Sequence, residues 1–177
     1  MNPITLEGCE TRGGISAWAT FSACGKYRYL LGRCWDLSLP VLSVDMLNPS
    51  TATEEVNDPT VSKCVTIAVA EKFGALVVRN LAGYRATDPK ELLVCNDPVG
   101  PLNRDVLSLG LTDTRVGAWG RIGKRTASRL QTTLWRAERR CTHVFQWTDK
   151  APFVPRHPLF LKNATRLIPI ASKPEAA

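Results

Sequence analysis

The chain has 177 residues, of which 44% are hydrophobic and 22% are charged, and its formal net charge is +7. This length fits one domain, and the composition is that of a globular protein and excludes an intrinsically disordered chain. The first twenty residues lack the apolar run of a secretory signal, and no later run reaches the ~18 residues that span a bilayer. We expect a soluble, cytoplasmic, single α/β domain over residues 1–177, with its core at about 26–170 between a flexible first dozen residues and a flexible tail from Ser172.

Six cysteines are scattered along the chain without a CxxC pair, and there are only two histidines. This spacing is typical neither of a zinc site nor of an iron–sulfur cluster. We expect reduced, inert thiols, no metal and no other cofactor.

Two strands are predicted first, at residues 27–32 and 41–47, and we expect them to pair in antiparallel fashion. A helix is predicted to follow to about residue 73, with Asp58 as its N-cap and Pro59 at its first position. The remaining predicted elements are a strand at 75–79, a short helix capped by 87–89 and ending at 94, a helix at 101–109, a strand at 114–119, a helix at 124–137 and a strand at 142–147.

Strands that alternate with helices indicate βαβ crossovers. We therefore predict a three-layer αβα sandwich with a mainly parallel central sheet. In such sheets, ligands bind at the carboxyl ends of the strands, so the residues that follow each strand are the candidate site.

Basic residues are concentrated in one segment. Eight of them lie between Arg115 and Arg140, against a single acid, Glu138. On one continuous helix, four arginines would lie within about 80° of one another: Arg121, Arg125, Arg129 and Arg136. Such a stripe is either a solvated face or a surface that binds phosphates of a nucleic acid.

Three polar residues stand out after predicted strands. Asn48 precedes Pro49 and is either an extended residue at a strand end or an amide that orients a water molecule. Asn80 is either a turn residue or an amide that reads the edge of a heterocyclic base. His157 lies in a proline-rich loop, where binding groups are often placed.

Carboxylates give a weaker signal. Asp58 and Asp88 are interpreted as helix caps, and Asp45 as a satisfied core residue or an edge group. No GxGxxG, GxxxxGK[ST] or GxSxG motif follows a strand, so the sequence gives no support to a redox, ATP-dependent or α/β-hydrolase function.

Five runs of the sequence carry a resemblance: LNPSTA, NDPT, RATDPKEL, AWG-x-x-GK and RHPLF. With them the chain resembles an uncharacterised bacterial and phage family, known only as a domain of unknown function. The resemblance covers about residues 27–161.

The chain is also similar, remotely, to the uracil-DNA glycosylase superfamily, which has a water-binding motif, a base-reading Asn, a Trp-Gly turn before a basic helix and a final His-Pro loop. The corresponding residues here are Leu47-Asn48-Pro49, Asn80, Trp119-Gly120 and His157-Pro158, in that order. The motifs differ in part, because Met46-Leu47 replaces a Gly and Leu159-Phe160 replaces a Ser-rich run. The resemblance therefore does not specify uracil as the base.

This resemblance implies that Asn48 positions the attacking water and that His157 stabilises charge on the departing base. It implies further base or substrate contacts by Pro49, Ser50, Thr51, Asn80, Arg85, Trp119, Gly120 and Arg156, and DNA phosphate contacts by Arg121, Lys124, Arg125, Arg129 and Arg136.

Three functions remain open from the sequence. The first is a DNA-glycosylase-like enzyme that acts on a modified or damaged base, the second is a non-catalytic module that binds nucleic acid or a base, and the third is an enzyme for small nucleosides or nucleotides. We expect DNA as the partner, no membrane association, and a monomer.

Overall fold

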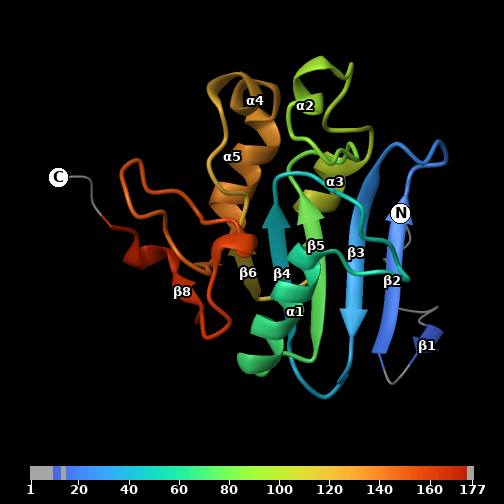
Figure 1. Cartoon of the computed structure of the whole chain (residues 1–177), viewed down its shortest axis with the longest axis vertical. Helices are drawn as coiled ribbons and strands as arrows, with labels where there is room; N and C mark the ends of the chain where they lie inside the picture. Colours follow the sequence, from blue (N-terminus) through green and yellow to red (C-terminus); the bar gives the residue numbers. More distant parts are fainter. Residues whose placement is uncertain (1–9, 13–14, 175–177) are drawn as a thin grey trace.

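The computed structural model describes residues 10–12 and 15–174. Within this part of the chain, eight strands form one sheet in the order β1-β2-β3-β5-β4-β6-β7-β8 (Figure 1). The strands are β1 (Glu10–Arg12), β2 (Ile15–Phe21), β3 (Arg28–Cys34), β4 (Val41–Met46), β5 (Ala75–Asn80), β6 (Thr114–Gly117), β7 (His143–Val144) and β8 (Ile168–Pro169). The helices are α1 (Pro59–Ala70), α2 (Glu91–Val94), α3 (Asn103–Ser108), α4 (Lys124–Arg129), α5 (Gln131–Arg140) and the short 3-10 helices η1 (Pro158–Phe160) and η2 (Ile170–Ser172).

The sheet is mixed, which corrects the prediction of a mainly parallel one. Strands β5, β4, β6 and β7 run parallel in its centre, whereas β1, β2, β3 and β5 pair antiparallel on one side and β7 and β8 on the other. The expected antiparallel pair of 27–32 and 41–47 is also wrong, because β5 lies between β3 and β4. β4 is buried on both faces, which favours the middle of the sheet with parallel neighbours on both sides.

The sequence patterns missed three strands: β1 and β8, which are the two edges of the sheet, and β2, which lies next to β1. Residues Glu10–Arg12 belong to the sheet, so the first dozen residues are not all a flexible end. The predicted tail began at Ser172, but Ser172 is the last residue of the 3-10 helix η2. The parts of the prediction at 1–9 and 175–177 lie outside the described residues. The last predicted strand, 142–147, is reduced to the two residues of β7, because beyond it the chain leaves the sheet and Trp147 forms an isolated bridge with Pro155.

Helices cover both faces of the sheet and give three layers (Figure 1). On one face, Val61, Cys64 and Ile67 of α1 belong to the same core cluster as Leu42 and Val44 of β4. On the other face, α3 lies against β3 and β5, and α5 lies against β6. No helix in the described part of the chain is long and apolar enough to cross a membrane.

Two helix predictions had opposite outcomes. The start of α1 is confirmed, since Asp58 Oδ1 accepts the N–H of Val61 at 2.8 Å and Pro59 is the first residue. The single basic helix at 124–137 is wrong, because the chain breaks at Leu130 into α4 and α5. The Thr133 hydroxyl donates to the carbonyl of Leu130 at 3.0 Å, a local bond of the kind that competes with helical hydrogen bonding.

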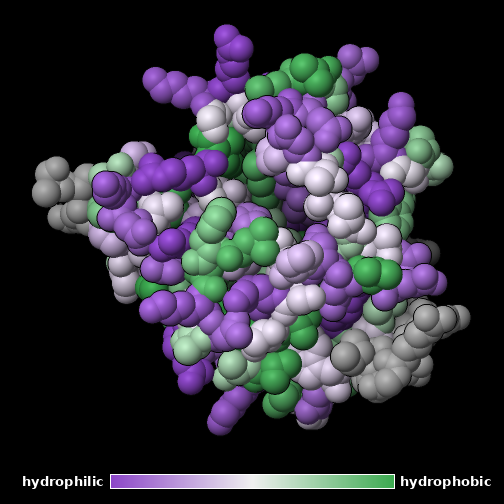
Figure 2. Space-filling view, in the orientation of Figure 1, coloured by the Kyte–Doolittle hydropathy of each residue, from purple (hydrophilic) through white to green (hydrophobic). Residues whose placement is uncertain are grey.

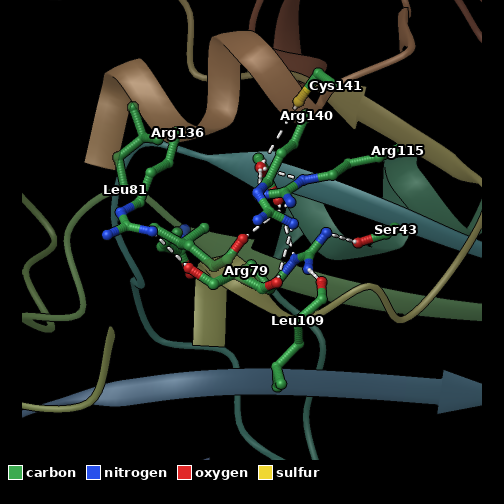
Figure 3. A network of polar contacts seen from close by, with 12 residues as sticks. Ser43, Arg79, Leu81, Leu109, Arg115, Arg136, Arg140 and Cys141 are labelled. Atoms are coloured by element: carbon green, nitrogen blue, oxygen red, sulfur yellow. Dashed lines mark hydrogen bonds and ion pairs between the residues drawn. The ribbon is translucent and has the colours of Figure 1, made fainter. Parts of the chain in front are cut away.

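A buried ionic network joins the three central strands (Figure 3). Asp45 of β4 accepts from Arg79 of β5, with Nε 3.1 Å from Oδ1, and from Arg115 of β6, with Nη2 2.6 Å from Oδ2. The remaining nitrogens of the arginines are occupied as well: Arg79 donates to the Ser43 hydroxyl at 2.6 Å, and Arg115 donates to the Leu107 carbonyl at 2.9 Å. Asp45 is therefore a core residue whose carboxylate has hydrogen-bond partners, which is one of the two interpretations of its sequence position.

We expect Asp45→Asn to lower the free energy of unfolding by about 3–5 kcal/mol, because it leaves two buried guanidinium groups without their counterion. Urea denaturation followed by circular dichroism measures this. The matched control is Asp149→Asn, which removes an exposed ion pair with Arg156 and should cost less than about 1 kcal/mol. Equal effects of the two substitutions would contradict the importance of the buried network.

Candidate functional site

The parallel strands β4, β5 and β6 end at one edge of the sheet, and the chain segments that follow them are tied together there. Leu81 N donates to Met46 O at 2.8 Å, and Ala86 N donates to Pro49 O at 2.9 Å, so the segment after β5 lies along the segment after β4. Ala118 N donates to Asp45 O at 2.8 Å, which brings the segment after β6 to the same edge. This arrangement encloses two adjoining cavities.

The larger cavity has a volume of about 630 Å³, within the usual range for small-molecule sites. Its apolar walls come from Leu47, Pro89, Trp119, Leu159 and Phe160, and its polar walls from Gly120, Arg121, Thr148, Asp149, Lys150, Arg156 and His157. Three of these side chains are cationic.

The smaller cavity has a volume of about 240 Å³ and is more polar in composition. It is lined by Arg28, Met46, Asn48, Ser50, Asp58, Thr60, Ala86, Thr87, Pro89, His157 and Leu159. Pro89, His157 and Leu159 line both cavities and form the wall between them.

His157 owes its position to the turn after β6. Gly120 has a φ of 73°, in the left-handed region, and its N–H donates to Pro155 O at 2.9 Å. A β-carbon at Gly120 would lie only 3.2 Å from Cβ of His157. The Trp-Gly turn thus lets the His-Pro loop approach the strand ends closely.

His157 is held as a neutral imidazole. Its Nδ1 accepts the N–H of Leu159 at 3.4 Å, which leaves Nε2 to carry the ring proton and to serve as the donor. Burial lowers the pKa of His157 from its ordinary value of 6.5, and the nearby Asp58 opposes that shift only in part. At neutral pH the residue can donate a hydrogen bond without carrying a charge.

Asn48 is fixed in one orientation. Its Nδ2 donates to Ala86 O at 2.7 Å and to Pro49 O at 3.1 Å. Its Oδ1 makes no hydrogen bond within the described structure and is the atom that can accept one from a ligand or water. The structure therefore brings Asn48 and His157 to the same small cavity, as expected for strand ends.

Asn80 is not brought to either cavity. It is the last residue of β5, its exposed fraction is 1%, and its Nδ2 has no hydrogen-bond partner in the structure. The strand continues one residue beyond the predicted end at Arg79, which keeps the Asn80 side chain inside the protein rather than in the loop.

Of the other predicted substrate contacts, some line one of the two cavities and others line neither. Ser50 lines the small cavity, and Trp119, Gly120 and Arg156 line the large one. Three predicted residues line neither: Pro49 is buried, Thr51 is exposed, and Arg85 lies over the Phe21 ring with its Cζ 5.0 Å from the ring centroid.

The predicted phosphate-binding residues do not form one stripe. Arg121 lines the large cavity, and Lys124 and Arg125 are exposed on α4. Arg121 also donates to the Lys150 carbonyl at 2.5 Å. Arg129 donates to the carbonyls of Leu92 at 2.7 Å and Cys95 at 2.6 Å, and Arg136 donates to the Ser108 hydroxyl at 2.8 Å. These two guanidinium groups tie α4 and α5 to neighbouring segments.

Sequence reasoning missed Arg28 and Asp58 as cavity residues. An arginine within the otherwise apolar strand at 27–32 was the available signal for Arg28, because a buried cation needs a compensating partner. Asp58 does cap α1, but it also lines the small cavity, and only the fold shows this second position. No group of three His, Cys, Asp or Glu side chains in the described ranges is arranged to hold a metal ion.

A family model described as "Protein of unknown function (DUF1643)" matches residues 28–159. The chain belongs to this family. The match includes the strand ends, all residues of the smaller cavity and all residues of the larger one except Phe160. Neither a curated protein nor a solved structure matches the chain.

We expect the imidazole of His157 to titrate below pH 6.5 in ¹H–¹⁵N NMR spectra, with His143→Gln used to assign the two histidines. Because the folded-state pKa lies below the unfolded one, the unfolded chain binds the proton more readily. The contribution of His157 to stability should therefore be fully present above about pH 6.5 and be lost as the pH falls from there through the folded-state pKa. A titration midpoint at or above 6.5 would contradict the neutral, buried imidazole.

Proposed function

We propose that this protein is a DNA-glycosylase-like enzyme that hydrolyses the N-glycosidic bond of a modified base. The observation that carries the proposal is that Asn48, Asp58 and His157 line one small cavity at the carboxyl ends of parallel strands. That cavity has room for a heterocyclic ring and adjoins a larger one with cationic walls. The resemblance of these motifs to the uracil-DNA glycosylase superfamily points to the same chemistry.

The residues of the small cavity suit the two halves of the reaction. Water adds to the anomeric carbon while the bond to the base breaks, and the bonding electron pair leaves with the base. Oδ1 of Asn48 is free to orient the water, and Asp58 is the carboxylate that can accept its proton. The Nε2–H of His157 can donate to the developing anion, and because the ring is neutral it retains that proton.

The surface around the cavities suits a DNA strand. Figure 2 shows a hydrophobic patch near the centre of this face, over the orange-red segment of Figure 1 that contains η1, with hydrophilic side chains around it. Leu159 and Phe160 are 50% and 69% exposed and stand at the cavity wall. Apolar side chains in such positions can enter a base stack and fill the place of a flipped nucleotide.

A second candidate is an enzyme for free nucleosides or nucleotides. The internal hydrogen bonds of Arg129 and Arg136 favour it, because donors of these two guanidinium groups are bound within the protein and not offered to a phosphate backbone. Dependence on salt separates the two functions, since DNA binding releases counterions and weakens steeply as salt increases.

We expect purified protein to leave abasic sites in at least one member of a set of oligonucleotides that carry uracil, hydroxymethylated, carboxylated or glycosylated pyrimidines. Single-turnover rates should fall by roughly 10²- to 10³-fold in Asn48→Ala and His157→Ala, while affinity for the oligonucleotide is retained. Thr66→Val, on the exposed side of α1, is the control and should keep the wild-type rate. Wild-type rates in both site variants would exclude the assigned roles.

Salt dependence provides a separate test of the DNA partner. Replacing both Arg121 and Arg125 by Ala should reduce the slope of log affinity against log salt by about one unit for each phosphate that the variant no longer binds. Arg139→Ala is the control, because that side chain is exposed on α5 and lies over the Trp135 ring. Fluorescence anisotropy with a labelled duplex gives the slopes, and an unchanged slope in the double variant would argue for the small-molecule function.

A further inference from the structure

Arg28 is a buried cation that has no ion-pair partner among the described residues. Its exposed fraction is 2%, and it lines the small cavity. Its Nη1 donates to Ala52 O at 2.7 Å, and among the described residues it forms no ion pair. Buried guanidinium groups are normally neutralised by a carboxylate, as Arg79 and Arg115 are by Asp45.

A bulge in β3 directs Arg28 toward this cavity. Thr20 of β2 is opposite Leu30, but the next residue, Phe21, is opposite Arg28, so Tyr29 is the extra residue. One extra residue reverses the alternation of side chains beyond it. Arg28 therefore points to the face covered by α1, where the cavity lies, and not to the face of Leu30.

The charges around Arg28 are positive on balance. The pKa of Arg28 is lowered to about 10, chiefly by burial; Asp58 opposes this shift, and the guanidinium groups of Arg85 and Arg33 add to it. Arg28 is still protonated at neutral pH. The three guanidinium groups of Arg28, Arg85 and Arg33 near the single carboxylate of Asp58 favour the entry of a negative group.

Hydroxyl groups complete the set of donors. Ser50, Thr60 and Thr87 line the same cavity, and none of their side chains makes a hydrogen bond within the part of the chain that the structure describes. Thr60 is in the first turn of α1, where the helix dipole adds positive potential. One guanidinium and three unused hydroxyls can together hold the oxygens of a small anion.

We infer that the small cavity binds one oxyanion group of the substrate, a carboxylate or a phosphate, with Arg28 as its charged ligand and the three hydroxyls as further donors. This inference rests on the proposed function and names its substrate class. The modified base carries an acidic substituent, which enters the small cavity beside Asn48 and His157. The sugar and the DNA strand then occupy the larger cavity and its cationic walls.

Isothermal titration calorimetry tests the inference without requiring turnover. The probes are two matched pairs, 5-carboxyuracil with uracil and 2′-deoxyuridine 5′-monophosphate with 2′-deoxyuridine. We expect wild-type protein to bind the acidic member of at least one pair more tightly. Preference for 5-carboxyuracil assigns the oxyanion to the base, whereas preference for the monophosphate alone assigns it to a free nucleotide.

Variants identify the ligand residues. Arg28→Gln should lose roughly 30-fold or more in affinity for the acidic probe, as when one partner of a buried charged hydrogen bond is removed, and it should not change affinity for the neutral one. Thr60→Val should lose roughly tenfold and keeps the test decisive if Arg28→Gln does not fold. Ser62→Ala, exposed on the same helix, is the control and should bind as the wild type does.

Equal binding of acidic and neutral probes by the wild type would overturn the inference, as would unchanged affinity in Thr60→Val. These results are independent of the glycosylase assay. Selective oxyanion binding without abasic sites would overturn the proposed reaction and keep the anion site. Abasic sites formed without selective binding would overturn the anion site and keep the proposed reaction.

Discussion

The buried ion pairs of Asp45 with Arg79 and Arg115 are the interaction on which the rest of the structure depends. They connect β4 to both of its parallel neighbours, near the carboxyl ends of β4 and β5 and near the start of β6. A slip of one residue in either strand would leave a buried charge unpaired and would exchange the two faces of that strand. The segments that follow β4, β5 and β6 leave the sheet shortly after these residues, so the position of Asn48 depends on a register that the buried charges fix.

Arginines serve three different purposes in this protein, and the net charge of +7 does not distinguish them. Arg79 and Arg115 neutralise a core carboxylate, and Arg129 uses its donors on backbone carbonyls to hold two segments together. Arg28 alone combines deep burial, contact with a cavity and no ion pair within the described residues. Arg121 lines the larger cavity and is the kind of cation that can meet a phosphate. Burial and hydrogen-bond partners, and not the density of positive charge, separate a structural arginine from a binding one.

The two cavities differ in chemistry and meet at His157. The larger has apolar walls and cationic edges, whereas the smaller combines a guanidinium, a carboxylate, an amide and hydroxyls. A neutral imidazole in the shared wall can donate into either side without adding charge to a region that already holds Arg28. The close approach at Gly120 positions that imidazole. The arrangement fits a ligand with a small polar head in one cavity and a larger body in the other.

The sequence by itself determined the elements that depend on local signals. Asp58 and Pro59 start α1 as predicted, and the central strands appear where apolar runs predict them, because capping and hydrophobic periodicity act over a few residues. Only the tertiary structure decided the strand order, the edge strands, the break at Leu130 and the different positions of Asn48 and Asn80. Both asparagines come at the end of an apolar run, and that pattern does not show which of them reaches a cavity. Which one reaches a cavity depends on where the strand ends against its neighbours, and that is set by contacts between residues far apart in the chain.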